Sequence, residues 1–120
     1  MNDYKSVISE IEKNEFNSFY LISGTEVFFT NRIVKLLVKK IVNEESKHFD
    51  YSVLYGKETN VNNIIEVARR FPLVSKYNLI IVKEAQYIEK GLDDLAKYVE
   101  NSSKKAIVVF CYMNKAFDKR

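Results

Sequence analysis

The chain has 120 residues, of which 47% are hydrophobic and 29% charged, values that fit one soluble globular domain. Its net charge of +3 is too small to indicate a nucleic-acid-binding surface, and its single cysteine, Cys111, excludes a disulfide within the chain. No apolar run approaches the roughly 20 residues that a membrane-spanning helix needs, so we expect a cytoplasmic protein that does not enter the membrane.

Hydrophobic spacing predicts a helix, a strand and a second helix in the first part of the chain. Residues 3–14 carry apolar side chains every three or four positions, and Asn2 is a candidate N-cap. The short apolar run at 18–23 ends at Gly24 and is typical of a buried strand. After it, residues 25–42 return to the helical period, with lysines mainly on the other face.

Strands and helices continue to alternate along the rest of the chain. The expected elements are a strand at 49–55, a helix that begins after Asn60, a strand at 79–82, a helix at 92–100 and a strand at 106–112. In the first of these strands, apolar side chains alternate from Phe49 to Tyr55. Pro72 is expected to end the middle helix, because proline lacks an amide hydrogen and disfavours helical geometry in Phe71 before it. Strands that are apolar on both faces predict a three-layer α/β fold, with a parallel sheet between helices.

The junction between the first strand and the following helix lies where a phosphate-binding P-loop would lie. Counted from Gly24, the second glycine position holds Phe29. The lysine position holds Thr30, and the Ser/Thr position holds Asn31. A ring blocks the close approach of phosphate, threonine carries no charge, and asparagine is a poor magnesium ligand. The junction therefore predicts either a non-functional P-loop or a strand–helix turn that was never one.

Other catalytic patterns are also missing from the sequence. The strand at 79–82 takes the place of a Walker B strand, but Lys83 and Glu84 follow it where metal-binding carboxylates are needed. The single histidine, His48, is expected at the surface, and Cys111 is expected to be a small buried side chain. We therefore expect no metal, no cofactor and no intrinsic catalysis.

Four segments taken together resemble one family. The segment FYLISGTEVFF at 19–29 is similar to the family's opening Y-L-I-x-G-x-E-x-[FY] pattern, and ARRFPLVSKY at 68–77 is similar to its P-[LM]-F-[SA]-x-x-R segment. The other two are VKEAQ at 82–86 and the helix and strand within 95–111. In order and spacing, the four resemble the N-terminal domain of the delta subunit of the bacterial DNA polymerase III clamp loader, most closely its Bacteroidetes branch.

The resemblance implies an AAA+, P-loop NTPase-like module that has lost ATP binding and acts in DNA replication by binding and opening the sliding clamp. Its implied partners are the clamp (the beta subunit) and the gamma/tau and delta prime subunits of the clamp loader, with DNA binding only through the complex. Family members continue with a lid domain and a collar domain. Residues 1–120 are therefore expected to be the N-terminal domain of a longer subunit.

The resemblance also implies a contact site after the third helix. In the family, an apolar pair at this position inserts into a hydrophobic pocket of the clamp. The pair corresponds to Leu73 and Val74, and Phe71 and Pro72 would position it. The family usually has phenylalanine where this chain has Val74, so the second anchor is smaller. The residues alone leave another interpretation open, in which Leu73 and Val74 cap the core of the domain itself.

Two other functions are compatible with the residues. A small nucleotide- or phosphate-handling α/β enzyme would use a site near Gly24 and would show measurable nucleotide affinity. A basic nucleic-acid-binding module would use Lys35, Lys39 and Lys40, and its affinity would fall steeply with salt. The same lysines are also expected on an ordinary solvated helix face.

Overall fold

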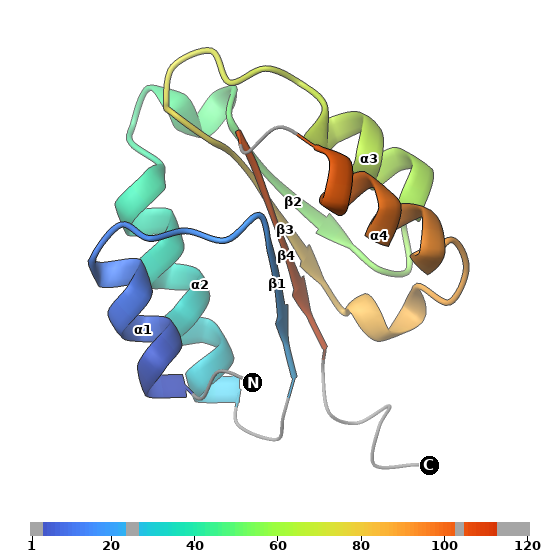
Figure 1. Cartoon of the computed structure of the whole chain (residues 1–120), viewed down its shortest axis with the longest axis horizontal. Helices are drawn as coiled ribbons and strands as arrows, with labels where there is room; N and C mark the ends of the chain where they lie inside the picture. Colours follow the sequence, from blue (N-terminus) through green and yellow to red (C-terminus); the bar gives the residue numbers. More distant parts are fainter. Residues whose placement is uncertain (1–3, 24–26, 103–104, 113–120) are drawn as a thin grey trace.

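The computed structural model describes residues 4–23, 27–102 and 105–112, so the candidate cap Asn2 lies outside the described residues. Helices and strands alternate as the sequence predicts (Figure 1): α1 (Tyr4–Glu12), β1 (Phe19–Ile22), α2 (Val27–Ile41), β2 (Tyr51–Tyr55), α3 (Val61–Ala68), β3 (Asn78–Lys83), α4 (Leu92–Asn101) and β4 (Ala106–Cys111). Short 3-10 turns, η1 (Ser46–His48) and η2 (Ala85–Tyr87), precede β2 and follow β3. None of the helices in these ranges is long and apolar enough to cross a membrane.

The strands form one parallel sheet in the order β1-β4-β3-β2. Helices α1 and α2 cover one face of this sheet, and α3 and α4 cover the other (Figure 1). This arrangement confirms the predicted three-layer α/β fold. Because all four strands run in the same direction, their amino ends meet at one edge of the molecule and their carboxyl ends meet at the opposite edge.

The two central strands supply both hydrophobic cores. Side chains alternate across a strand, so Leu79 and Ile81 of β3 pack on the side of α1 and α2, whereas Ile80 and Val82 pack on the side of α3 and α4. None of the four is exposed to solvent. Cys111, at the end of β4, is buried in the core under α1 and α2, as expected from its apolar neighbours.

The start of the second strand differs from the prediction. β2 begins at Tyr51, and the two residues before it reverse the expected pattern: the Phe49 side chain is 58% exposed, whereas Asp50 is buried at 1%. The cause is the turn η1, since the backbone N–H groups of Phe49 and Asp50 both donate to the Ser46 carbonyl, at 3.0 and 2.7 Å. The chain therefore still turns at these residues and does not yet follow the sheet.

Helix α3 begins as predicted and ends earlier than predicted. The Asn60 side chain accepts a hydrogen bond from the Asn63 backbone N–H at 2.8 Å, which is the expected N-cap. The helix ends at Ala68, before Pro72 is reached, so the proline does not itself end it. The buried side chain of Asn78 donates to the carbonyls of Val67 and Arg70, at 2.8 and 3.2 Å, and so connects the end of the helix to the start of β3.

Candidate functional site

An exposed apolar loop joins α3 to β3. Residues 71–77, here called the apolar loop, belong to no helix or strand. The side chains of Phe71 and Leu73 are 72% and 73% exposed, and that of Val74 is 43% exposed. Pro72 between them is half-buried. None of the three apolar side chains belongs to either core, which contradicts the interpretation that Leu73 and Val74 cap the core of the domain.

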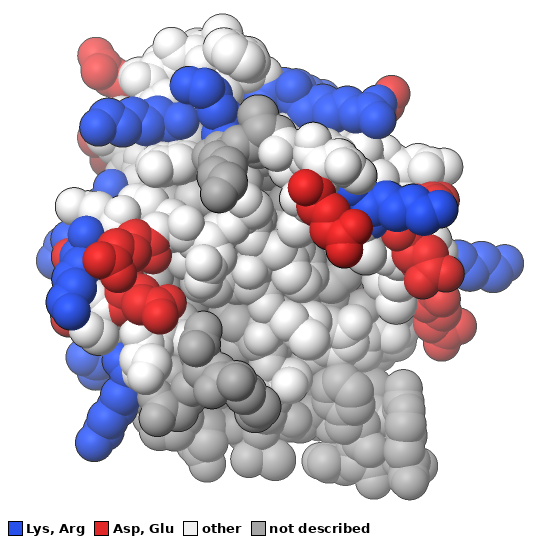
Figure 2. All heavy atoms as spheres, in the orientation of Figure 1, with Lys and Arg blue, Asp and Glu red and all other residues white. Residues whose placement is uncertain are grey.

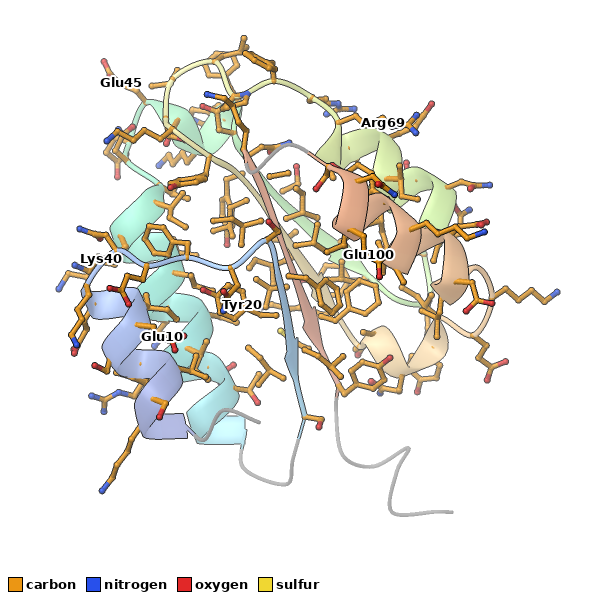
Figure 3. The ribbon with its side chains drawn as sticks, viewed as in Figure 1. Glu10, Tyr20, Lys40, Glu45, Arg69 and Glu100 are labelled. Carbon is orange, nitrogen blue, oxygen red and sulfur yellow. The ribbon has the colours of Figure 1, made fainter. Side chains whose placement is uncertain are left out.

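The apolar loop lies at the amino edge of the sheet. It leads directly into β3, and in Figure 1 it arches over the end of the molecule opposite the strand arrowheads. Phe49 and Asp50 precede β2, the strand beside β3, so they lie at the same edge. Figure 3 labels Arg69 at the end of α3 from which the loop departs. The two sequence segments before β2 and β3 therefore meet because their strands are neighbours.

A single carboxylate binds the backbone of the apolar loop. Oδ1 of Asp50 accepts from the backbone N–H of Leu73 at an N···O distance of 2.6 Å. Its Oδ2 accepts from the backbone N–H groups of Val74 and Ser75, at 2.6 and 2.7 Å. The Ser75 hydroxyl donates to the Tyr77 carbonyl at 2.6 Å. These bonds fix the backbone while the side chains of Leu73 and Val74 point to solvent.

The electrostatics of Asp50 follow from this geometry. Burial by itself raises the pKa of a carboxyl group, because the charged form loses its hydration. The backbone N–H groups of Leu73, Ser75 and Val74 lower the pKa of Asp50, and they prevail, so its pKa lies below its ordinary value. Asp50 is therefore a buried and charged acceptor at neutral pH.

The surroundings of the apolar loop are basic. Arg70 and Lys76 flank the exposed apolar side chains and are themselves exposed. The Lys105 ammonium lies 5.7 Å from the centroid of the Phe71 ring, within the range of a cation–π contact. Figure 2 shows Lys and Arg side chains on both sides of an uncharged tip at this end of the molecule. The edge therefore combines an apolar tip with a positive rim.

Helix α2, which carries the predicted P-loop residues Thr30 and Asn31, follows the carboxyl end of β1 in the chain. Gly24 and the side chain of Phe29 fall outside the described part of the structure, whereas Thr30 is buried and Asn31 is exposed within α2. A non-functional P-loop at this junction therefore remains a prediction.

The predicted Walker B residues follow β3. Lys83 is its last residue and is exposed, and Glu84 adopts a left-handed backbone conformation with φ of 55°. The Gly56 backbone N–H donates to the Lys83 carbonyl at 2.8 Å, and a Cβ at Gly56 would overlap the Glu84 carbonyl. This close contact explains why a glycine follows β2, because a side chain at this position would clash with the backbone after β3. A degenerate Walker B motif likewise remains a prediction.

The remaining candidate side chains show no catalytic arrangement. His48 is exposed in η1, and burial raises the pKa of the Cys111 thiol to about 11, which opposes a role as nucleophile. No group of three or more His, Cys, Asp or Glu residues that could hold a metal occurs within the described ranges.

The lysines of α2 are solvated. Lys35, Lys39 and Lys40 are all exposed, and the Lys40 ammonium donates to the Glu12 carbonyl at 2.9 Å (Figure 3). Lys40 therefore connects α2 to the end of α1. This contact gives one of the three lysines a structural role.

Sequence reasoning missed the polar residues that support the apolar loop. The strand expected at 49–55 includes Asp50 without a role for it, and the prediction of a strand at 79–82 gives no role to Asn78 just before it. The available signal was an acidic residue just before one strand and an apolar, proline-containing connection just before another. That signal becomes useful only when the two strands are known to be neighbours.

Comparison with known proteins identifies the family. The model of the family described as "DNA polymerase III, delta subunit" matches residues 20–120. The chain belongs to this family. It is 24% identical over 123 aligned residues to the DNA polymerase III subunit delta of Bacillus subtilis (strain 168), and the match covers 95% of the chain and 35% of that protein. The chain therefore spans about a third of the length of this curated delta subunit.

Solved structures show the same fold. A Bacillus subtilis DNA clamp loader delta protein superposes with a TM-score of 0.83 at 23% identity, and the match covers 92% of this chain and 35% of that one. A DNA polymerase III gamma subunit-related protein of Thermotoga maritima superposes with a TM-score of 0.64 at 14% identity, and the match covers 97% of this chain and 41% of the other. The predicted family and the AAA+-like α/β fold of the delta subunit are thus both confirmed.

Proposed function

We propose that this chain is the N-terminal, clamp-contacting domain of a DNA polymerase III delta subunit. In this role it would bind the sliding clamp and help to open it for loading onto DNA. The apolar loop would insert Leu73 and Val74 into a hydrophobic pocket of the clamp, with Phe71 and Pro72 beside them. The observation that carries the proposal is the exposure of Phe71 and Leu73, at 72% and 73%, in a loop whose backbone is hydrogen-bonded to Asp50.

The energetics of such a contact are favourable. Burying one leucine or valine side chain contributes roughly 1.5–3 kcal/mol. Two adjacent anchors can therefore dominate an interface, as is usual where a few buried residues carry most of the binding energy. The positive rim formed by Arg70, Lys76 and Lys105 fits an apolar pocket whose rim is acidic.

The rest of the clamp loader completes the proposed function. The gamma/tau and delta prime subunits would be the other partners, and DNA would be reached only through the complex. ATP would be hydrolysed by those partners, and their conformational change would expose or cover the apolar loop. The assembly would act in the cytoplasm, where DNA is replicated.

Calorimetric titration with the sliding clamp of the same organism tests the proposal. The double substitution Leu73→Ala/Val74→Ala should weaken binding by about 2–4 kcal/mol, because both anchors lose most of their apolar area. Circular dichroism should show an intact fold, since neither side chain is part of a core. Leu21→Ala/Leu92→Ala is a matched control, because both leucines are exposed, at 60% and 41%, far from the loop in sequence. It should bind as the wild type does.

Two outcomes contradict the proposal. One is equal binding by the Leu73→Ala/Val74→Ala variant and the wild type. The other is no binding by the wild-type chain and none by a longer subunit that includes the lid and collar domains. Titration of the chain with ATP and magnesium tests the alternative that it is a nucleotide-handling enzyme, because such an enzyme requires measurable affinity for the nucleotide.

A further inference from the structure

The apolar loop lacks the backbone pairing that normally orders a connection. Its residues belong to no helix or strand, yet the backbone N–H groups of Leu73, Val74 and Ser75 all point to one side chain. An exposed loop with large apolar side chains would otherwise be free to turn those side chains inward and cover them. The hydrogen bonds to Asp50 oppose this rearrangement, because all three would be lost.

Asp50 is itself rigidly held. Its backbone N–H donates to the Ser46 carbonyl at 2.7 Å, and its own carbonyl accepts from the Leu79 backbone N–H, in β3, at 2.9 Å. Ser46 is fully buried. Backbone hydrogen bonds therefore connect Asp50 to the turn η1 on one side and to the central strand β3 on the other. The hydrogen bonds to Asp50 therefore fix the backbone of the loop relative to the sheet.

The chemistry of the acceptor is specific. Three N–H donors converge on two oxygens, and an ionised carboxylate offers acceptors on both. An asparagine in the same place would present an NH₂ group to at least one N–H donor, leaving that donor without an acceptor. Among the described residues, no Lys, Arg or His forms an ion pair with Asp50, so its charge is balanced by the three loop amides and by the Ser75 hydroxyl, which donates to Oδ2 at 3.4 Å.

From this geometry we infer that Asp50 is a positioning residue, which fixes the apolar loop in its exposed conformation before any partner binds. The consequence for binding rests on the function proposed above. A loop already ordered in its binding conformation loses less conformational freedom on association, so affinity is gained without a contact between Asp50 and the partner. Asp50 itself stays buried beneath the interface at 1% exposure.

Amide hydrogen exchange followed by NMR tests the inference without a partner. In the wild-type chain, the amides of Leu73, Val74 and Ser75 should exchange at least about tenfold more slowly than in an unstructured peptide, as expected for hydrogen-bonded groups. Exchange at the unstructured rate would overturn the inference, and this measurement needs no variant.

The variant Asp50→Asn tests the same point by substitution. It should accelerate exchange at Leu73, Val74 and Ser75 by about tenfold, whereas exchange in the core of β3 changes less. Clamp binding should weaken by about tenfold as the loop loses its order. Asp93→Asn is the matched control, because it removes a carboxylate from the exposed first turn of α4 and should change neither quantity.

The outcomes separate the inference from the proposed function. If the wild type binds the clamp, Leu73→Ala/Val74→Ala weakens binding as proposed and Asp50→Asn changes neither binding nor loop exchange, the inference is wrong and the proposed function stands. If no form of the protein binds the clamp but Asp50→Asn releases the loop amides, the proposed function is wrong and the positioning role of Asp50 stands.

Discussion

The two edges of the sheet differ in what they present to solvent. At the amino edge, Phe71 and Leu73 are largely exposed on a loop that is hydrogen-bonded to a buried carboxylate. At the carboxyl edge, where open α/β sheets usually bind ligands, some described residues are packed closely and others are exposed, with Tyr55 at 44% and Tyr87 at 48%. There, Gly56 meets the backbone of Glu84, and Cys111 is buried. An open α/β sheet can therefore carry its most exposed apolar side chains at the edge opposite the one where such sheets usually bind ligands.

The comparison makes distinct predictions for the two edges. Truncation of the exposed apolar side chains at the amino edge should affect binding more than stability, and changes at the carboxyl edge should affect stability and leave the loop unaltered. The proposed loss of clamp binding in Leu73→Ala/Val74→Ala is the largest effect expected at the amino edge.

At the carboxyl edge, Gly56→Ala should lower the free energy of unfolding by about 2–4 kcal/mol, because the added Cβ would overlap the Glu84 carbonyl and force β2 and the residues after β3 apart. Urea denaturation measures this change. Glu58→Ala, at an exposed position nearby, is the control and should stay within about 0.5 kcal/mol of the wild type. Wild-type stability of the Gly56→Ala variant would show that this contact is loose.

At the amino edge, stability should depend on pH through Asp50. Its pKa is lowered on folding from an ordinary value of 3.8, so its stabilisation is present above that pH and is lost as the pH falls through the folded pKa. At pH 7, Asp50→Asn should be less stable than the wild type by about 2–3 kcal/mol, as expected for lost hydrogen bonds to a charged group. Urea denaturation at pH 7 and at about pH 3 should show this difference shrinking at the lower pH. A difference that is constant with pH would exclude ionised Asp50 as its source.

The smallest effect is expected at Cys111. Burial raises its pKa from an ordinary value of 9.0 to about 11, so at pH 9 its thiolate fraction should be about one-fiftieth of that of an exposed cysteine. Alkylation of the folded chain should be correspondingly slow, and unfolding in urea should restore the ordinary rate. A mass-spectrometric time course measures both rates. Equal rates in the folded and unfolded chain would mean that the carboxyl edge opens readily near β4.

Much of the fold could be predicted because its determinants are local. The periodic apolar side chains located every helix and strand, and Asn60 marked the start of α3 through its own side chain. The errors occurred where specific hydrogen bonds, which the hydrophobic pattern does not reveal, are found. Asn78, from the start of β3, donates to carbonyls at the end of α3, and the turn at Phe49 is closed by a bond to the nearby Ser46 carbonyl. The tendency of proline to end a helix and the alternation of apolar side chains along a strand carry no information about such hydrogen-bond partners.

The candidate site likewise has one part that the sequence indicated and another that only the tertiary structure revealed. The sequence pointed to Leu73 and Val74 through a motif that resembles the family's, but it left open whether they face solvent or the core. Their exposure was decided by the tertiary structure. The sequence by itself determined the alternating α/β order and the family, because both reside in local patterns and their spacing. Only the tertiary structure decided the role of Asp50, because 23 residues separate it from Leu73 and the two meet only when β2 and β3 lie side by side.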